Sequence, residues 1–300
     1  MSLETRGRKP VVMTRRALLL RLSPLLIPYV SFFCAGVVLA FVQSLGLMSP
    51  VPLHQDYLDA YVRLFDSPWF YEMFGFSLYV ALISALIATA GGTLLAYGIW
   101  GMPVVLRRMS VVYKTTLILP HIAIGFIIMV LCSQSGVLAS LAHALGLIAR
   151  PEEFPNMLYD QSGLGLIAAY TYKEMPFAIL MVLGPLAGFD RRLVTCARMF
   201  GATRTAIFWR IILPHIAPAM HSAFIILFLY AFGAFDIPYI LGSSKPAMLS
   251  IEVYNLYFKR DLINRPTALA MLMLMLLFSV LFIMLYSRVV ASLRAQERKL

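Results

Sequence analysis

The side chains most able to do chemistry are three charged residues that lie within long apolar stretches. Lys173 and Glu174 are adjacent and precede Pro176, and Asp236 precedes Pro238. Ionisable residues in a membrane-spanning helix are costly, and they tend to face a bundle interior or a water-filled path. We therefore predict that Lys173, Glu174 and Asp236 are candidates for a solute pathway, with Asp236 as a second buried acid.

Two explanations of these charges stay open. Glu174 and Asp236 either line the outer part of a pathway and favour a cationic solute, or they satisfy contacts between helices and carbonyl groups freed near prolines. Adjacent positions on a helix point in different directions, so Lys173 cannot simply pair with Glu174. Pro176 removes a backbone hydrogen bond and is expected to kink its helix.

Nucleotide-binding and catalytic patterns are missing from the sequence. The Walker A spacing Gly-x-x-x-x-Gly-Lys-Ser/Thr does not occur, and there is no catalytic triad or metal-ligand spacing. Cys34, Cys132 and Cys196 are far apart, and His121 and His215 each follow a proline, where we expect them to bond the backbone. We therefore expect no catalytic residue, no metal and no cofactor, and the energy for any transport must come from a partner.

The composition is that of a membrane protein. Of 300 residues, 61% are hydrophobic and 13% are charged, whereas soluble domains carry about 25% charged residues. The net charge of +11 comes from short basic clusters between apolar runs. This pattern is typical of residues that set membrane topology, and it argues against a nucleic-acid partner.

Six apolar stretches have about the 20 residues that a membrane-spanning helix needs. We therefore predict an all-α integral membrane protein, with a basic N-terminal segment at 1–23, a six-span domain at 24–288 and a tail at 289–300. The first stretch is too long for a signal peptide and is interpreted as a retained anchor. The predicted spans are 24–47, 74–100, 115–134, 163–188, 216–241 and 266–288.

The distribution of Lys and Arg predicts the orientation. The segments 1–23, 101–114, 189–215 and 289–300 together hold 17 of these residues, against 6 in the alternate connections. Because cytoplasmic connections carry the excess of Lys and Arg, both termini are expected inside the cell.

Two outer connections are expected to contain short helices. Residues 51–73 carry many aromatic residues, which predicts a helix lying at the membrane interface. Residues 135–149 are predicted to form a short re-entrant or surface helix that ends at Arg150-Pro151.

The connection from 189 to 215 is the most informative segment. Arg191, Thr195 and Arg198 share one face of a first helix, and Leu193, Ala197 and Phe200 share another. Gly201 then permits a left-handed backbone, and Thr203 is placed to cap a second helix that runs to Leu213 before Pro214 and Pro218. Taken alone, this pattern also fits an amphipathic segment whose arginines face anionic lipid.

This connection resembles the signature loop of permease subunits of binding-protein-dependent ABC importers. The pattern of that loop is Glu-Ala-Ala, three residues, Gly, nine residues, then Ile-x-Leu-Pro. Thr195 and Cys196 replace the Glu and the first Ala of the pattern, so a charge contact at Thr195 is in doubt. The residues that match in register are Ala197, Gly201, Ile211, Leu213 and Pro214.

The resemblance implies the type I ABC importer permease fold in a bacterial cell (inner) membrane, with alternating access. Six spans, Leu119-Pro120 and the stretch 232–242 are similar to the spermidine/putrescine-type branch of these permeases. In the family, the helix before the glycine docks on the ATPase, so residues 191–203 would be the coupling element here. The coupling-loop residues implied are Arg191, Thr195, Ala197, Arg198, Gly201, Ala202, Thr203, Ile211, Leu213 and Pro214.

The same resemblance implies the partners. They are a pair of ATP-binding subunits, a second permease, an extracytoplasmic solute-binding protein that acts on the outer loops, and membrane lipid. The missing Glu at Thr195 favours a different chain as the second permease. The substrate is expected to be a polyamine-like small cation, with an anion such as a phosphonate left open. The main alternative is a stand-alone secondary transporter or channel, which predicts sequence-related halves that are not seen. A membrane-embedded enzyme would need clustered polar residues that the sequence lacks.

Overall fold

The computed structural model describes residues 15–48, 57–103, 106 and 110–297, and these ranges contain helices but no strands. Parts of the segments expected at 1–23, 51–73, 101–114 and 289–300 lie outside the described residues. In chain order, the helical elements are α1 (Arg15–Ser44), α2 (Asp59–Phe65), α3 (Pro68–Gly101), η1 (Ser110–Lys114), α5 (Thr115–Ile118), α6 (His121–Cys132), α7 (Val137–Ala144), η2 (Pro151–Glu153), α8 (Leu164–Ala187), α9 (Arg191–Met199), α10 (Arg204–Ile207), η3 (Phe208–Ile212), α11 (Leu213–Gly233), α12 (Asp236–Leu241), α13 (Leu249–Tyr254), η4 (Asn255–Lys259), η5 (Leu262–Asn264) and α14 (Arg265–Glu297).

The six expected spans are confirmed. Within the described ranges, six helical stretches are long and apolar enough to cross a membrane. The bounds of the third and fifth spans differ from those expected, for reasons given below. The spans are Leu20–Ser44, Pro68–Gly101, His121–Ala144, Leu164–Ala187, Arg204–Gly233 and Leu262–Ser292.

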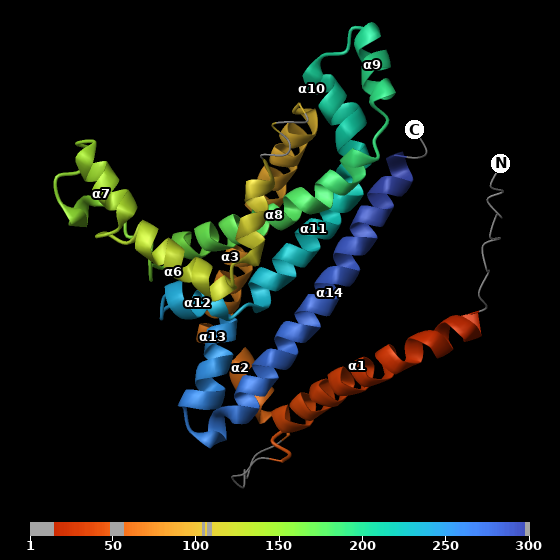
Figure 1. The fold of residues 1–300 in the computed structure, drawn as a ribbon. Helices are drawn as coiled ribbons and strands as arrows, with labels where there is room; N and C mark the ends of the chain where they lie inside the picture. The colour runs from red at the N-terminus through yellow and green to blue at the C-terminus, as the bar shows by residue number, and fades with distance from the viewer. Residues whose placement is uncertain (1–14, 49–56, 104–105, 107–109, 298–300) are drawn as a thin grey trace, which may run out of the picture.

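Helices α3, α8 and α11 form the centre of the fold, and α14 packs beside them (Figure 1). Helix α1 leans away from this centre and contacts mainly α14, so its apolar stretch is left exposed (Figure 1). The most extensive contact in the chain joins α3 to α8. The packing of α3 against α8 therefore positions the connections that extend from the ends of these two helices.

A face of small residues explains why α3 and α8 come so close. Ala81, Ala85, Ala88 and Gly92 recur at helical spacing on α3, and all four are buried. A Cβ atom added at Gly92 would lie 2.6 Å from the Cβ atom of Ala178 on α8. Small residues at such positions let helix backbones approach closely in a membrane. Helical spacing alone places these four residues on one face of α3, and the fold packs that face against α8.

The third span is not the continuous helix expected at 115–134. Helix α5 ends at Ile118, and α6 begins only at His121. The residue before a proline is pushed to an extended backbone, and Leu119, before Pro120, has ψ 134°. The apolar span therefore continues from α6 into α7 rather than starting at 115.

The fifth span begins and ends earlier than expected, at Arg204 and Gly233. We predicted one helix over 216–241, but α11 ends at Gly233, and Asp236 starts the separate helix α12. Ala234 has ψ 145°, which is extended rather than helical. The acid expected inside the end of this span lies instead at the start of a new helix.

The segments 51–73 and 135–149 contain short helices, as expected, with different limits. Among residues 57–73, the described part of this segment, the predicted short helix corresponds to α2, because α3 already begins at Pro68. Helix α7 confirms a short helix within 135–149, and it ends at Ala144 rather than at Arg150-Pro151. Gly146 follows that end with φ 71°, a backbone that favours glycine.

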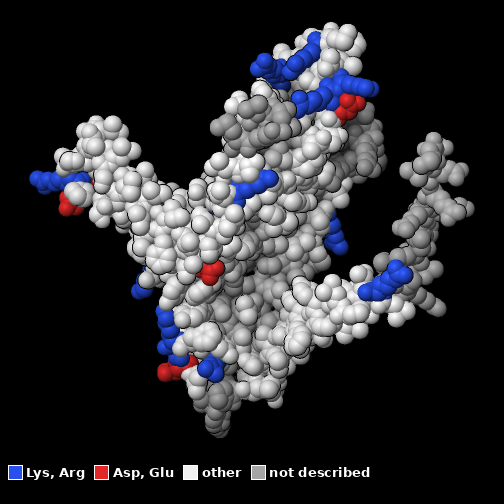
Figure 2. All heavy atoms as spheres, viewed as in Figure 1, with Lys and Arg blue, Asp and Glu red and all other residues white. Residues whose placement is uncertain are grey.

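The two ends of the molecule carry different elements. Helices α9 and α10 lie at the same end as the C-terminal end of α14, while α2 and the turn before α14 lie at the other end (Figure 1). On the face drawn in Figure 2, Lys and Arg side chains gather over α9 and α10. The connection predicted to be cytoplasmic from its charge thus forms a protruding basic tip.

Candidate functional site

The protruding tip is a helix, a turn and a second helix, and each is capped by its own sequence. Asp190 accepts a hydrogen bond from the backbone amide of Arg192 at 2.9 Å and so caps α9. Gly201 ends α9 with φ 78°, and Ala202 donates its backbone amide to the carbonyl of Ala197 at 3.0 Å. The Thr203 hydroxyl accepts from the amide of Ala206 at 3.2 Å and caps α10. The predicted roles of Gly201 and Thr203 are confirmed.

The end of the second helix was predicted wrongly. We expected it to stop before Pro214, but α10 continues through the π-helical η3 into α11. The amide of Leu213 bonds the carbonyl of Phe208, five residues back. This wider turn accommodates Pro214, which has no amide to donate and would crowd an ordinary helix. The second helix of the 189–215 connection therefore joins the fifth span without a break.

Ile211, Leu213 and Pro214 lie at this junction and not at the tip. Ile211 and Leu213 are half-buried and pack against the apolar cluster beneath the tip, whereas Pro214 is exposed. This cluster joins the ends of three spans to α10. Its buried members are Ala96, Ile99, Ile179, Val182, Leu186, Phe189, Ile207, Ile212 and Ile216.

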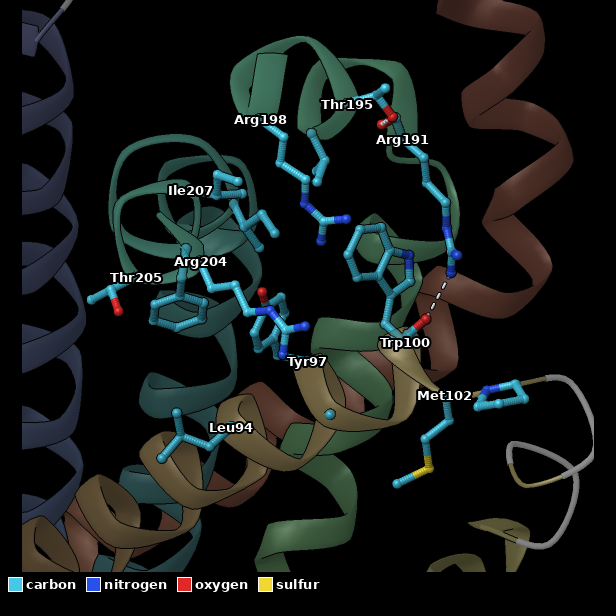
Figure 3. Close-up of a pocket in the computed structure, with 16 residues that line it drawn as sticks. Leu94, Tyr97, Trp100, Met102, Arg191, Thr195, Arg198, Arg204, Thr205 and Ile207 are labelled. Atoms are coloured by element: carbon cyan, nitrogen blue, oxygen red, sulfur yellow. Dashed lines mark hydrogen bonds between the residues drawn. The ribbon is translucent and has the colours of Figure 1, made fainter. Parts of the chain in front are cut away.

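A single arginine fixes α9 to the end of α3. The Arg191 guanidinium donates to the carbonyl oxygen of Trp100 at 2.7 Å and lies 4.6 Å from the centroid of the Trp100 ring (Figure 3). Trp100 in turn packs edge-on against Phe189, with ring centroids 5.8 Å apart. A guanidinium that both stacks and bonds in this way is held in one orientation. The tip is thus attached to α3 as well as to α11.

The two faces of α9 have different surroundings. Arg191, Thr195 and Arg198 share a face, as predicted, and line a cavity between the tip and α3 (Figure 3). On the outer side, Met199 and Phe200 are 82% and 91% exposed. Ala197 was expected to share the face of Leu193 and Phe200, but it is half-buried against the apolar cluster. Met199 and Phe200 therefore form an exposed apolar knob that the described residues leave uncovered.

Two residues of the site were missed by the sequence reasoning. Asp190 could have been found, since an Asp directly before an amphipathic helix is a strong N-cap signal. Trp100 could not, because its contact with Arg191 joins positions 91 residues apart. Only the fold brings these two side chains together.

Lys173 is engaged with the backbone of the broken third span. Its Nζ donates to the carbonyls of Thr116, Leu117 and Leu119, at 2.9, 3.3 and 2.5 Å. The break at Pro120 leaves these carbonyls without helical partners, and the ammonium group of Lys173 supplies donors for them. The carbonyls that Lys173 contacts lie beside Pro120 and not beside Pro176, the proline in its own helix.

The two acids have different surroundings. Glu174 is 3% exposed, and neither of its carboxyl oxygens has a hydrogen-bond partner among the described residues. The buried hydroxyl of Tyr170, one turn earlier on α8, also lacks one. Asp236, expected to be a second buried acid, is exposed because the chain breaks before α12. The prediction of burial is therefore right for Glu174 and wrong for Asp236.

The smaller expectations have mixed outcomes. His215 lies 3.3 Å from the carbonyl of Pro185, so its bond to the backbone is confirmed. His121 instead packs at a tilt against the ring of Tyr230, with 4.8 Å between the ring centroids. Among the described residues, no group of three His, Cys, Asp or Glu side chains is placed to hold a metal ion.

Comparison with known proteins adds a family and several relatives. The family described as "binding-protein-dependent transport system inner membrane component" matches residues 88–295. The chain is 26% identical to the probable ABC transporter permease protein YurN of Bacillus subtilis (strain 168), over 73% of this chain and 77% of the relative. It is also 26% identical to the spermidine/putrescine transport system permease protein PotB of Escherichia coli (strain K12), over 64% and 68%.

Among solved structures, the fold is similar to a chain of a bacterial ABC transporter involved in the import of the acidic polysaccharide alginate. The TM-score is 0.74 at 18% identity, and the match covers 91% of this chain and 94% of that one. At this level of identity the similarity concerns the fold alone. The all-helical arrangement expected for a type I importer permease is thereby confirmed.

Proposed function

The chain belongs to the family of inner membrane components of binding-protein-dependent transport systems, and from this premise we propose that residues 191–203 couple a partner ATPase to the spans. The chain is a multi-pass permease of a bacterial ABC importer, and ATP is hydrolysed on a separate subunit. The importer also works with a solute-binding protein. What we propose beyond this is the coupling element, the second permease and the class of substrate.

The observation that supports this coupling role is the contrast between the two sides of the tip. Its outer side exposes Met199 and Phe200, while its inner side is fixed by Arg191, Trp100 and the apolar cluster. A docked ATPase that moves the exposed knob would therefore move the ends of α3 and α11 with it. Such transmission between an ATP site on one chain and a gate on another is allosteric coupling through rigid elements.

The second permease is proposed to be a different chain, and the two would alternate between inward-open and outward-open states. Thr195 holds the place of the acid in the family loop, and its hydroxyl only reaches the carbonyl of Arg191 in its own helix, at 3.4 Å. A heterodimer would let the other permease keep the acidic contact. In this arrangement 24–288 is the permease domain, 1–23 and 289–300 are cytoplasmic, and the binding protein meets the outer loops.

Replacing Met199 and Phe200 by serine tests the coupling role. Both side chains are almost fully exposed, so the double substitution should leave the amount of folded permease unchanged. Loss of an aromatic anchor at an interface costs about 2 kcal/mol or more, which corresponds to roughly thirtyfold weaker binding. We expect the ATPase to be absent from the permease purified in mild detergent, as measured by mass spectrometry.

Leu147→Ser is the matched control, because Leu147 is 74% exposed and lies in the connection after α7. It should retain the ATPase. Equal recovery of ATPase with both variants would contradict the coupling role of this tip. A chain that emerges without an ATPase yet moves solute in liposomes would support the stand-alone transporter instead.

The substrate is proposed to be a small cation of polyamine type. The support is Glu174, buried without a partner, together with the exposed Asp236 on the neighbouring helix α12 and the named substrate of the PotB relatives. A buried carboxylate is costly unless a cation or hydrogen bonds compensate it. Lys173 contributes less to the proposed solute pathway than the two acids, since its ammonium already donates to three carbonyls.

Glu174→Gln and Asp236→Asn test the substrate class. If the acids attract a passing cation, each variant should lower the uptake of a polyamine by roughly five- to thirtyfold, as expected for about 1–2 kcal/mol of lost charge interaction. Radiolabelled uptake into intact cells measures the effect, with permease amount determined in the same cells. Unchanged uptake in both variants, or uptake of an anionic solute that neither variant affects, would rule out this role.

A further inference from the structure

The cavity between the tip and α3 is strongly basic. It has a volume of about 870 Å³, and Arg191, Arg198, Arg204, Thr195 and Thr205 are among the residues that line it. Figure 3 shows Arg191, Arg198 and Arg204 extending from α9 and α10 toward the space around the Trp100 ring. None of the described residues that line the cavity is acidic.

The positive charge in this cavity is not balanced by the described chain. Arg191 uses one N–H group on the carbonyl of Trp100 and stacks on its ring. Arg198 and Arg204 have no hydrogen bond or ion pair with any described residue. Like charges that converge in a partly enclosed space repel, and an anion with several acceptor oxygens relieves this repulsion while accepting from the free N–H groups.

The wall of the cavity indicates where such an anion comes from. Leu94 is 61% exposed and lines the cavity, and Ile87, two turns earlier on α3, is 45% exposed. Tyr97 and Trp100 lie at the end of the same span, where aromatic residues mark the boundary between lipid and water. An apolar strip thus leads from the lipid-facing side of α3 directly to the three guanidinium groups.

We propose that this cavity binds the phosphate of an anionic lipid headgroup. The phosphate oxygens accept from Arg198, Arg204 and the free N–H groups of Arg191, and an acyl chain follows Leu94 and Ile87 along α3. Basic pockets between helices on the cytoplasmic side of a membrane protein are suited to such headgroups. The site uses the inner face of α9, so it is separate from the apolar knob proposed to meet the ATPase and does not depend on it.

Arg198→Gln combined with Arg204→Gln tests the site, because it removes two charges from the cavity and keeps side chains of similar length. Arg192→Gln combined with Arg210→Gln is the matched control, since both arginines are exposed on the same connection and neither lines the cavity. Each double variant removes the same net charge. The full chain is isolated from native membranes in mild detergent, together with any subunits that accompany it.

The probes are short-chain phosphatidylglycerol, short-chain phosphatidylcholine and inorganic phosphate. The thermal unfolding midpoint is followed as each is titrated, and native mass spectrometry counts the bound molecules. We expect phosphatidylglycerol to stabilise the wild type and the control variant. With about 1 kcal/mol for each basic residue near the membrane surface, its apparent affinity should fall roughly thirtyfold in the cavity variant.

Three results would overturn the assignment. If the cavity variant and the control respond alike to phosphatidylglycerol, the lipid does not bind here. If inorganic phosphate or phosphatidylcholine stabilises the wild type as strongly, an anionic lipid is not the ligand. If ATPase subunits in the sample displace the lipid, acidic groups of the ATPase occupy the cavity. Recovery of the ATPase is measured separately, so failure of the coupling proposal is recognised independently.

Discussion

Replacing Gly92 by valine should reduce the folded permease more than a surface substitution on the same helix. The Cβ atom of the new side chain would lie only 2.6 Å from the Cβ of Ala178 and 3.0 Å from the carbonyl oxygen of Met175. These atoms belong to the backbone and first side-chain atoms of α8, so they cannot turn aside. Overpacking of this kind costs about 3 kcal/mol. The yield of monodisperse protein and its thermal unfolding midpoint measure the loss.

Gly75→Val is the matched control, because Gly75 lies on the same helix and a Cβ atom there meets nothing within 4 Å. Both variants introduce the same side chain and the same loss of backbone freedom. They differ only in whether α8 lies against the position. A midpoint for Gly92→Val as high as that of Gly75→Val would show that α3 and α8 are not packed as described.

Lys173→Met is the second substitution with a large expected effect. The methionine has a similar shape but no ammonium, so the carbonyls of Thr116, Leu117 and Leu119 lose their donor. Each buried polar group left without a partner costs about 1–3 kcal/mol. We expect a lower unfolding midpoint, and faster hydrogen exchange in the segment from α5 to the start of α6.

Lys114→Met is its control, since Lys114 lies next to α5 but is exposed. That variant should unfold like the wild type. The comparison also separates the two roles considered for Lys173. If Lys173→Met keeps the wild-type midpoint but changes the apparent KM for solute uptake, Lys173 acts on the solute and not on the broken helix.

The site has consequences for how ATP-driven movement reaches the membrane. Arg191 ties the tip to α3, and the unbroken passage from α10 to α11 ties it to the fifth span. A lipid phosphate in the cavity would add a second connection between α9 and α3. Transport in this importer should therefore respond to the anionic lipid content of the membrane, even though the lipid touches neither the ATPase nor the solute.

The sequence by itself determined the features that depend on local order. A run of about 20 apolar residues has few stable states in a bilayer other than a helix, so the six spans were predicted. The turn between the two helices of the tip was also predicted, although the end of the second helix was not. Gly201 and Thr203 act on amides within a few residues, and their effects do not depend on the rest of the fold. The small face of α3 was visible too, because helical spacing places its residues together whatever they contact.

Only the tertiary structure decided which distant groups satisfy one another. Lys173 reaches a carbonyl 57 positions away, and Arg191 finds Trp100 91 positions away. No local pattern encodes such pairings, because each depends on how two spans cross. The burial of Glu174 against the exposure of Asp236 has the same origin, and so has the convergence of three arginines from two helices on one cavity. Hydropathy places these charges along the chain, and helix packing determines what each of them meets.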